Sequence, residues 1–163
     1  MRIILVGVGK IKEKFFTMAV EEYQKRLSRY CKLEIVEVAD EKTPDRASLA
    51  EEEQIKKREG ERILRVIQQK ERERTYVIAL AIEGKQMDSV QFSEKIAELG
   101  LKGNSDIIFV IGGSLGLDRC VLERADEWIS FSSLTFPHQL MRVILLEQIY
   151  RAFRIANREP YHK

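Results

Sequence analysis

Two segments of the chain place small and hydroxyl residues directly after an apolar strand. Val110–Leu117 reads Val-Ile-Gly-Gly-Ser-Leu-Gly-Leu, and Phe131–Phe136 reads Phe-Ser-Ser-Leu-Thr-Phe. Residues of these types let backbone N–H and C=O groups approach a ligand closely, and such groups can read the edge of an adenine without a charged side chain. Because ligand crevices in open α/β sheets lie outside the carboxyl ends of the strands, both segments are candidates for one pocket.

Polar side chains follow at the start of the next helical segment and at the end of the chain. His138 and Arg142 are four residues apart and share one helix face near the proposed pocket, where they can be catalytic or simply core or interface residues. The ending Tyr161-His162-Lys163 follows several arginines. A basic tail with an aromatic side chain suits RNA, and a solvated terminus is the alternative.

The elements that position these residues alternate between strands and helices. Apolar runs predict strands at Ile3–Val8, Leu33–Val38, Tyr76–Ile82, Ile107–Ile111 and Trp128–Ser132. Charged, helix-compatible segments separate most of them, so we expect a single α/β domain over residues 1–163 with a largely parallel sheet. The continuously apolar strands Ile3–Val8 and Ile107–Ile111 should be central.

A helix is expected over residues 137–153, with Pro137 in its first turn and Thr135 as a possible cap. Its apolar residues point in nearly every direction, so it must be covered on all sides. One small sheet covers only one side, and we therefore expect a homodimer in which a second copy covers another.

Three glycines near strand ends are interpreted as turn residues rather than as ligand-binding residues. Gly7 and Gly9 begin like a dinucleotide fingerprint, but Lys12 stands where the third glycine should be, so a tight strand-to-helix turn is favoured. Glu83-Gly84-Lys85 taken alone is also best read as a turn.

Composition excludes several classes of protein. The formal net charge of +2 does not demand a nucleic-acid partner, although the 10–32 segment has a local basic excess that could bind phosphates or be ordinary surface. The charge-dense residues 51–74 favour a solvated helix with Ile55, Ile63, Leu64 and Ile67 turned inward.

Two distant cysteines match no disulfide framework or metal site, and no apolar run suits a signal peptide or membrane span. We therefore expect a reduced, cytoplasmic setting without metal.

Taken together, Val110–Leu117, Phe131–Phe153 and the ending Tyr161-His162-Lys163 closely resemble the ribosomal RNA large subunit methyltransferase H family of the SPOUT superfamily, over essentially the whole chain. The resemblance implies a trefoil knot in the C-terminal part of the α/β fold, with S-adenosylmethionine bound in it. It implies methyl transfer to N3 of pseudouridine 1915 in 23S rRNA, on assembled ribosomes. The implied cofactor contacts are Leu80, Gly112, Phe131, Ser132, Ser133, Leu134, Thr135 and Phe136.

The resemblance also implies that RNA is held by the catalytic dimer itself. Tyr161 and His162 from the opposite subunit, together with Arg142, would complete the catalytic site, and metal is not required. The proton acceptor stays open: His162 is the best candidate, Arg142 cannot act as a base, and the imide can also lose its proton to water. Two other readings stay open, namely an RNA- or ribosome-binding protein without catalysis and an enzyme with a nucleotide in a Rossmann-like pocket.

Overall fold

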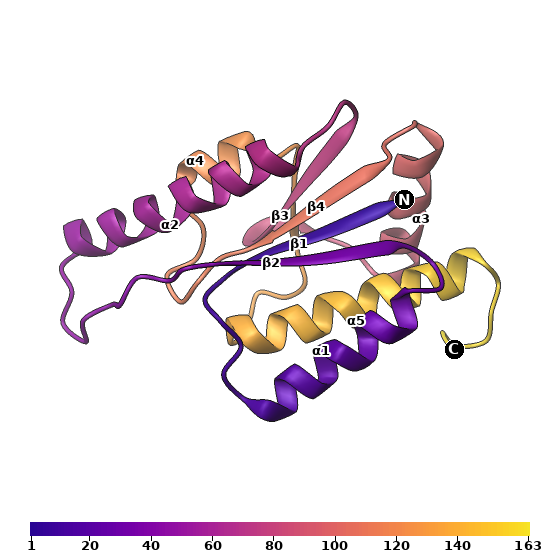
Figure 1. Ribbon diagram of the computed structural model, residues 1–163, viewed down its shortest axis with the longest axis horizontal. Helices are drawn as coiled ribbons and strands as arrows, with labels where there is room; N and C mark the ends of the chain where they lie inside the picture. The colour runs from indigo at the N-terminus through magenta and orange to yellow at the C-terminus, as the bar shows by residue number, and fades with distance from the viewer.

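The computed structural model describes residues 1–163 as one five-stranded parallel sheet between two layers of helices (Figure 1). The strands are β1 (Arg2–Val8), β2 (Lys32–Val38), β3 (Thr75–Gln86), β4 (Asp106–Ile111) and β5 (Glu127–Ser130), and they pair in the order β2-β1-β4-β3-β5. The helices are α1 (Lys14–Leu27), α2 (Leu49–Lys70), α3 (Ser89–Leu101), α4 (Arg119–Arg124) and α5 (His138–Ala156). The α/β class and the parallel sheet predicted from the strand pattern are confirmed.

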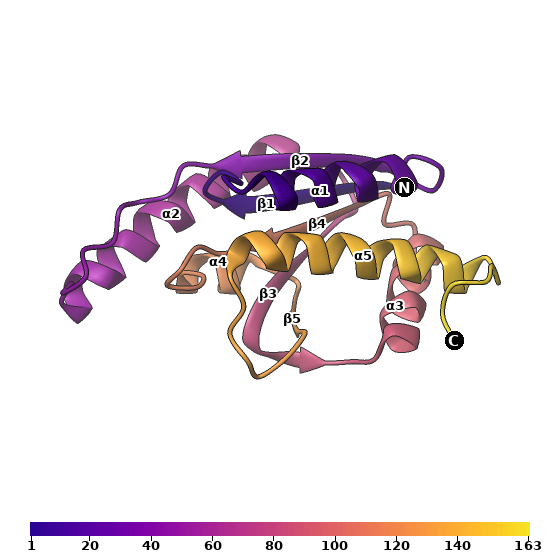
Figure 2. The same cartoon turned by 90° about the horizontal axis from the view of Figure 1, so that it is seen from below.

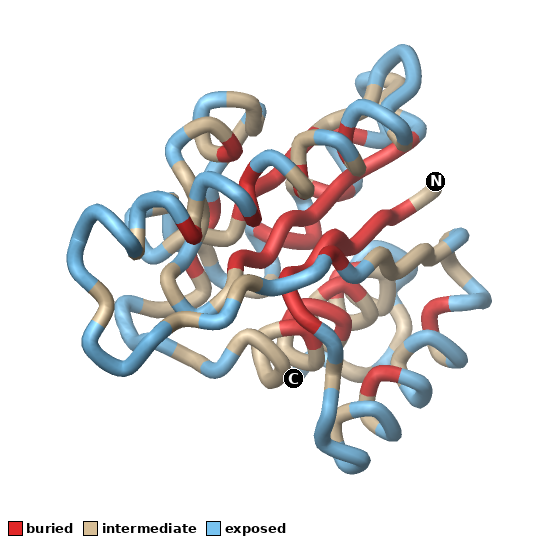
Figure 3. Tube along the Cα trace, turned by 60° about the vertical axis from the view of Figure 1, so that its left-hand side comes forward, coloured by how far each residue is buried: buried red, intermediate tan, exposed pale blue.

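Alternate residues of the central strands build two separate cores. Leu5 of β1 and Phe109 of β4 face α1, α3 and α5, where they pack with residues such as Leu145. Val6 and Val110 face the other way, toward α2 and α4. Figure 3 shows the strands as the most buried part of the chain, as expected for strands covered on both faces.

The charged helix α2 has the predicted solvated character. Ile55, Ile63 and Ile67 are buried and Leu64 packs against the core beneath them. Its first residue follows a capping box in which Ser48 Oγ accepts from the Glu51 backbone N–H and the Glu51 carboxylate accepts from the Ser48 N–H.

Three local predictions are wrong. Thr135 does not cap α5. The helix begins at His138, one residue later than predicted, so Pro137 is its N-cap residue and no side chain caps it. Gly84 lies within β3 rather than in a turn, beside an irregularity in the pairing with β5 between Leu80 and Lys85. A Cβ at Gly84 would stand 2.6 Å from the Ile129 carbonyl carbon, so the glycine permits the close approach of β5.

Gly7 is also part of a strand, β1, while Gly9 makes the turn that follows, with φ of +80°. A Cβ at Gly7 would lie 2.7 Å from Arg142 Nε. The glycine at position 7 therefore leaves room for an arginine that crosses the end of β1.

Helix α5 runs under the sheet from the carboxyl ends of the strands toward their amino ends. It packs against α1 and α3 and crosses beneath β1 and β4, with its first residue at the carboxyl ends of the strands and the chain terminus at the opposite end (Figures 1 and 2). Leu145, Leu146, Ile149 and Ala152 are buried by the chain itself, whereas Val143, Ile144, Tyr150 and Phe153 remain partly exposed. No helix is long and apolar enough to cross a membrane.

Candidate functional site

A cavity of about 890 Å³ lies at the carboxyl ends of β4 and β5, beside the middle of β3. The middle of β3 contributes Leu80–Glu83, the end of β4 and the following loop contribute Ile111–Leu117, and the end of β5 and the following segment contribute Ile129–Ser132 and Leu134–His138. Lys56 enters from α2, and Leu122 and Met141 complete the lining. The two segments singled out from the sequence thus share one pocket, together with the middle of the third strand.

Glycines shape the loop after β4 that lines the cavity. Gly116 has φ of +82°, and its N–H donates to the Gly113 carbonyl at 3.1 Å, which folds the loop back on itself. A Cβ at Gly112 would stand 2.7 Å from the Gly116 carbonyl carbon. Glycine at position 112 is therefore required by the loop's own packing.

The segment after β5 is held by hydrogen bonds between residues close in sequence and by one aromatic contact. Ser130 Oγ donates to the Ser132 carbonyl at 3.0 Å, and Ser132 Oγ accepts from the Leu134 N–H at 3.0 Å. The Phe131 ring meets Phe92 of α3 edge-on, with centroids 5.9 Å apart. Among the predicted cofactor contacts in this segment, Ser133 alone does not line the cavity.

The first turn of α5 fastens this segment to the end of β1. Arg142 is 1% exposed, and its Nη2 donates to the carbonyls of Val8 at 2.7 Å and Gly9 at 2.6 Å. Its Nη1 lies 3.7 Å from a Glu37 carboxylate oxygen, while burial lowers the pKa of Arg142 and Glu37 opposes that shift. Arg142 does not line the cavity, so within one chain it is placed to position backbone rather than to touch a ligand there.

Gln139 adds a second attachment from the same turn. Its side-chain oxygen accepts from the Lys12 N–H at 3.0 Å and, more weakly, from the Glu13 N–H at 3.4 Å. Glu13 is the N-cap residue of α1 and makes no side-chain cap of its own. A side chain of α5 therefore satisfies backbone donors at the start of α1, and the turn between β1 and α1 depends on α5.

His138 is a titratable side chain that lines the cavity. Its Nδ1 is buried without a hydrogen-bond partner. Burial, followed by the Arg142 charge, lowers the pKa of His138, and Asp40 partly opposes that shift. The lowered pKa favours the neutral imidazole, which is the form that accepts a proton.

Glu59 of α2 is a buried polar residue that sequence pattern alone cannot distinguish from its charged neighbours. It is 5% exposed, accepts from the Glu41 N–H at 3.0 Å, and has an oxygen 3.1 Å from where a Cβ of Gly113 would lie. Burial raises the pKa of Glu59. It supports the glycine loop from behind the cavity.

The C-terminal tail folds back along the second half of α5. Tyr161 donates to Glu147 at 3.0 Å, the Arg151 guanidinium lies over the Tyr161 ring at 4.7 Å, and His162 Nδ1 is 3.3 Å from Arg151 Nη1. Burial and Glu147 raise the pKa of Tyr161 to about 12. The structure thus brings the predicted cofactor contacts together, but within one chain it does not bring Tyr161 and His162 to them. No group of three or more His, Cys, Asp or Glu is arranged to hold a metal ion.

Comparisons with known proteins agree with one another. A family described as predicted SPOUT methyltransferase matches residues 1–162. Proteins named ribosomal RNA large subunit methyltransferase H from Bifidobacterium adolescentis and Clostridium botulinum are 63% and 60% identical over the full length of both chains. A probable methylase family protein from Haemophilus influenzae, at 11% identity, covers 99% of this chain and 70% of its own with a TM-score of 0.53, which shows similarity of fold alone.

The Arg142 clamp leads to a stability prediction. Arg142→Met removes the donors to two buried carbonyls, and each unsatisfied group costs about 1–3 kcal/mol. We expect a loss of at least about 2 kcal/mol in the free energy of unfolding, measured by urea denaturation. Arg119→Met is the matched control, because the Arg119 side chain is 89% exposed. Equal stability of the two variants would contradict the clamp.

Proposed function

The chain belongs to the ribosomal RNA large subunit methyltransferase H family of SPOUT methyltransferases, and we propose that it is an rRNA methyltransferase that uses S-adenosylmethionine. The proposed target is N3 of pseudouridine 1915 in 23S rRNA, on assembled ribosomes in the cytoplasm. The proposal treats residues 1–163 as one catalytic domain. The cavity at the carboxyl ends of β4 and β5, beside the middle of β3, is the observation that carries it.

The residues of this cavity fit an adenosyl group. Its volume of about 890 Å³ lies in the range of small-molecule sites, and its walls are largely apolar side chains and backbone. The cofactor contacts implied by the resemblance are Leu80, Gly112, Phe131, Ser132, Ser133, Leu134, Thr135 and Phe136, and all except Ser133 are present in the lining. Peptide N–H and C=O groups of the glycine loop and of Phe131–Phe136 would hold the adenine edge.

The bound cofactor supplies an electrophilic methyl group on a sulfonium. The protein must align the N3 of the base with that methyl and receive the N3 proton, since the ring nitrogen gives up its hydrogen as the new N–C bond forms. Arg142 contributes by fixing the first turn of α5, and with it His138, relative to β1. Two histidines are candidates for the proton, namely His162 of the tail and His138 of the cavity wall.

We also propose a homodimer in which the tail of one chain completes the cavity of the other. The cavity lining reaches Met141 of α5, whereas Tyr161 contacts Glu147 and Arg151, roughly 9–15 Å further along a helix that rises about 1.5 Å per residue. Phe15 and Met18 of the neighbouring α1 are 63% and 59% exposed, which supports an apolar contact with a second copy. Arg142, Tyr161 and His162 form the proposed catalytic set, with Arg142 in a positioning role.

A trefoil knot is part of the proposal. The family resemblance supports it, as does the path by which the chain leaves the edge strand β5 and returns in α5 between α1 and α3. In this arrangement the three cavity loops would belong to the knotted region.

The first test combines cofactor binding with methyl transfer. Gly112→Val should weaken S-adenosylmethionine binding by at least about tenfold, equal to 1.4 kcal/mol, because the new side chain forces the glycine loop out of position. Gly100→Val is the control, since only the flexible end of Met1 lies near that glycine. Calorimetry measures binding, and mass spectrometry of 23S rRNA from undermethylated ribosomes locates the transferred label. Ribosome binding without any transfer would favour the non-catalytic alternative.

Mixed dimers test the contribution of the tail across subunits. Gly112→Val chains and chains lacking residues 161–163 should each be nearly inactive. After unfolding and refolding together, they should regain transfer, because a mixed dimer pairs one intact cavity with the tail of its partner. If each tail served the cavity of its own chain, the mixture would stay inactive. Sedimentation measures the dimer in every sample.

The pH dependence of transfer distinguishes the two histidines. If His138 accepts the proton, activity rises with pH through the lowered pKa of His138, with its midpoint below about 6.5, and is level above it. His138→Gln should then reduce the rate at pH 7 by about 10²-fold and make it rise with pH throughout, while His162→Gln keeps the level region. A His138→Gln enzyme with an unchanged profile would assign the proton to His162 or to water.

A further inference from the structure

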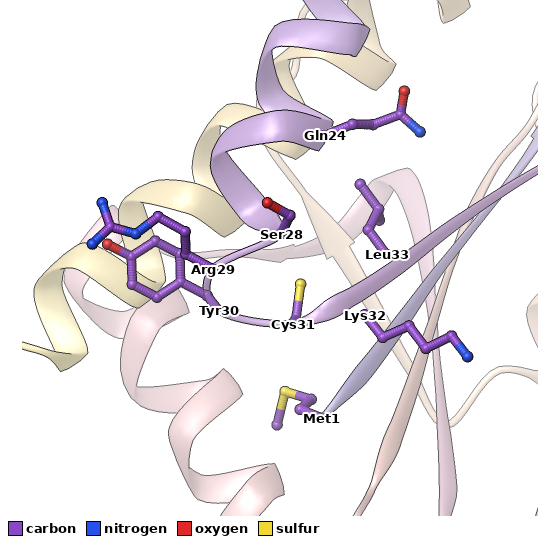
Figure 4. A pocket seen from close by; sticks show the side chains of 8 residues that line it. All are labelled: Met1, Gln24, Ser28, Arg29, Tyr30, Cys31, Lys32 and Leu33. Carbon is purple, nitrogen blue, oxygen red and sulfur yellow. The ribbon is translucent and has the colours of Figure 1, made fainter.

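A second recess, of about 620 Å³, lies at the opposite edge of the sheet from the cofactor cavity (Figure 4). It is formed by Met1, the last turn of α1 and the residues Tyr30–Leu33 that lead into β2. It is separate from the residues that line the cavity. Neither the family resemblance nor the catalytic proposal assigns it a role.

The charge of this recess is positive and uncompensated. Arg29 and Lys32 line it, and neither takes part in an ion pair. No acidic residue is in the lining. Cys31 adds no negative charge, because burial raises the pKa of its thiol to about 11. The arginine one turn earlier, Arg26, is by contrast already paired with Glu22.

Two partly buried residues of the recess, Cys31 and Leu33, lie between the two cations. Cys31 and Leu33 pack against the main core, and Figure 4 shows Arg29 and Lys32 extending to opposite sides of them. Gln24 extends beyond Leu33, and its amide makes no hydrogen bond within the chain. This arrangement offers an apolar surface for a ring, an amide for its edge, and one cation on each side.

The recess is joined to the C-terminal tail. The Tyr30 hydroxyl donates to Glu159 at 2.5 Å and accepts from Arg154 at 3.2 Å, and Arg154 also donates to the Pro160 carbonyl at 3.0 Å. The Tyr30 ring stacks on Phe153 with centroids 5.6 Å apart. If the tail enters the cavity of the partner chain, as the proposed function requires, the recess stands beside that cavity.

We propose that the recess binds an unstacked nucleotide of single-stranded RNA, with the base on Cys31 and Leu33 and the flanking phosphates at Arg29 and Lys32. This inference rests on the proposed function, because it identifies the anion as the rRNA substrate. Single-stranded segments present bases that can leave the stack, and each phosphate neutralised by a cation contributes to a salt-dependent affinity. The recess thus holds an rRNA loop next to the nucleotide that enters the partner's cavity.

The test uses a single-stranded oligoribonucleotide of about ten nucleotides and an RNA duplex of equal length, with binding followed by fluorescence anisotropy over a range of salt concentrations. Arg29→Gln combined with Lys32→Gln should weaken single-strand binding about tenfold. The salt slope should fall by about 1.4, since each lost phosphate contact accounts for about 0.7. Lys57→Gln combined with Arg58→Gln on α2 removes the same charge from exposed positions and should change little.

Either of two binding results would overturn the inference. One is an equal loss in the recess variant and the α2 variant, which would mean that only net charge matters. The other is an equal loss for duplex and single strand, which would exclude a bound base. Calorimetry with S-adenosylmethionine should give the same affinity for both variants and the unaltered protein. Methyl transfer at full rate in the recess variant would refute RNA binding by the recess and leave the proposed function intact. RNA binding by the recess in a protein that transfers no methyl group would refute the proposed function and leave the recess proposal intact.

Discussion

The contact between Arg142 and the end of β1 is the interaction on which the site depends. The buried Arg142 guanidinium donates hydrogen bonds to the carbonyls of Val8 and Gly9, which lie more than a hundred residues earlier in the sequence. A buried guanidinium is costly unless it is hydrogen-bonded, so the geometry of both partners is tightly constrained. Gly7 is part of the same arrangement, because any side chain there would collide with Arg142.

This contact links regions that would otherwise be independent. The segment Phe131–Pro137 forms one wall of the cavity and leads directly into the turn that carries Gln139 and Arg142. That turn holds the β1–α1 connection at Lys12 as well as at Gly9. The shape of the cavity and the position of α1 are therefore coupled, and α1 carries the exposed Phe15 and Met18 that we assign to the contact with a second copy.

Most of the fold could be predicted from the sequence because it depends on local patterns. Continuous apolar runs located β1 and β4 in the middle of the sheet, and glycine and hydroxyl residues after strands identified two walls of the cavity. The errors concern contacts between distant segments. Gly84 resembles a turn until β5 is placed against it, and Glu59 resembles any other charge on α2 until the Gly113 loop covers it. Likewise, nothing in the local sequence shows that Arg142 is buried or that Thr135 leaves α5 uncapped.

Hydrogen–deuterium exchange with and without S-adenosylmethionine tests the coupled cavity most directly, because it measures the protection of each segment separately. Binding should slow exchange in residues 112–117 and 131–137, and also in residues 9–13, which the first turn of α5 holds. Residues 28–33, at the far edge of the sheet, should be unchanged. Protection that leaves 112–117 and 131–137 unaffected, or that appears only at 28–33, would show that the cavity is not coupled in this way.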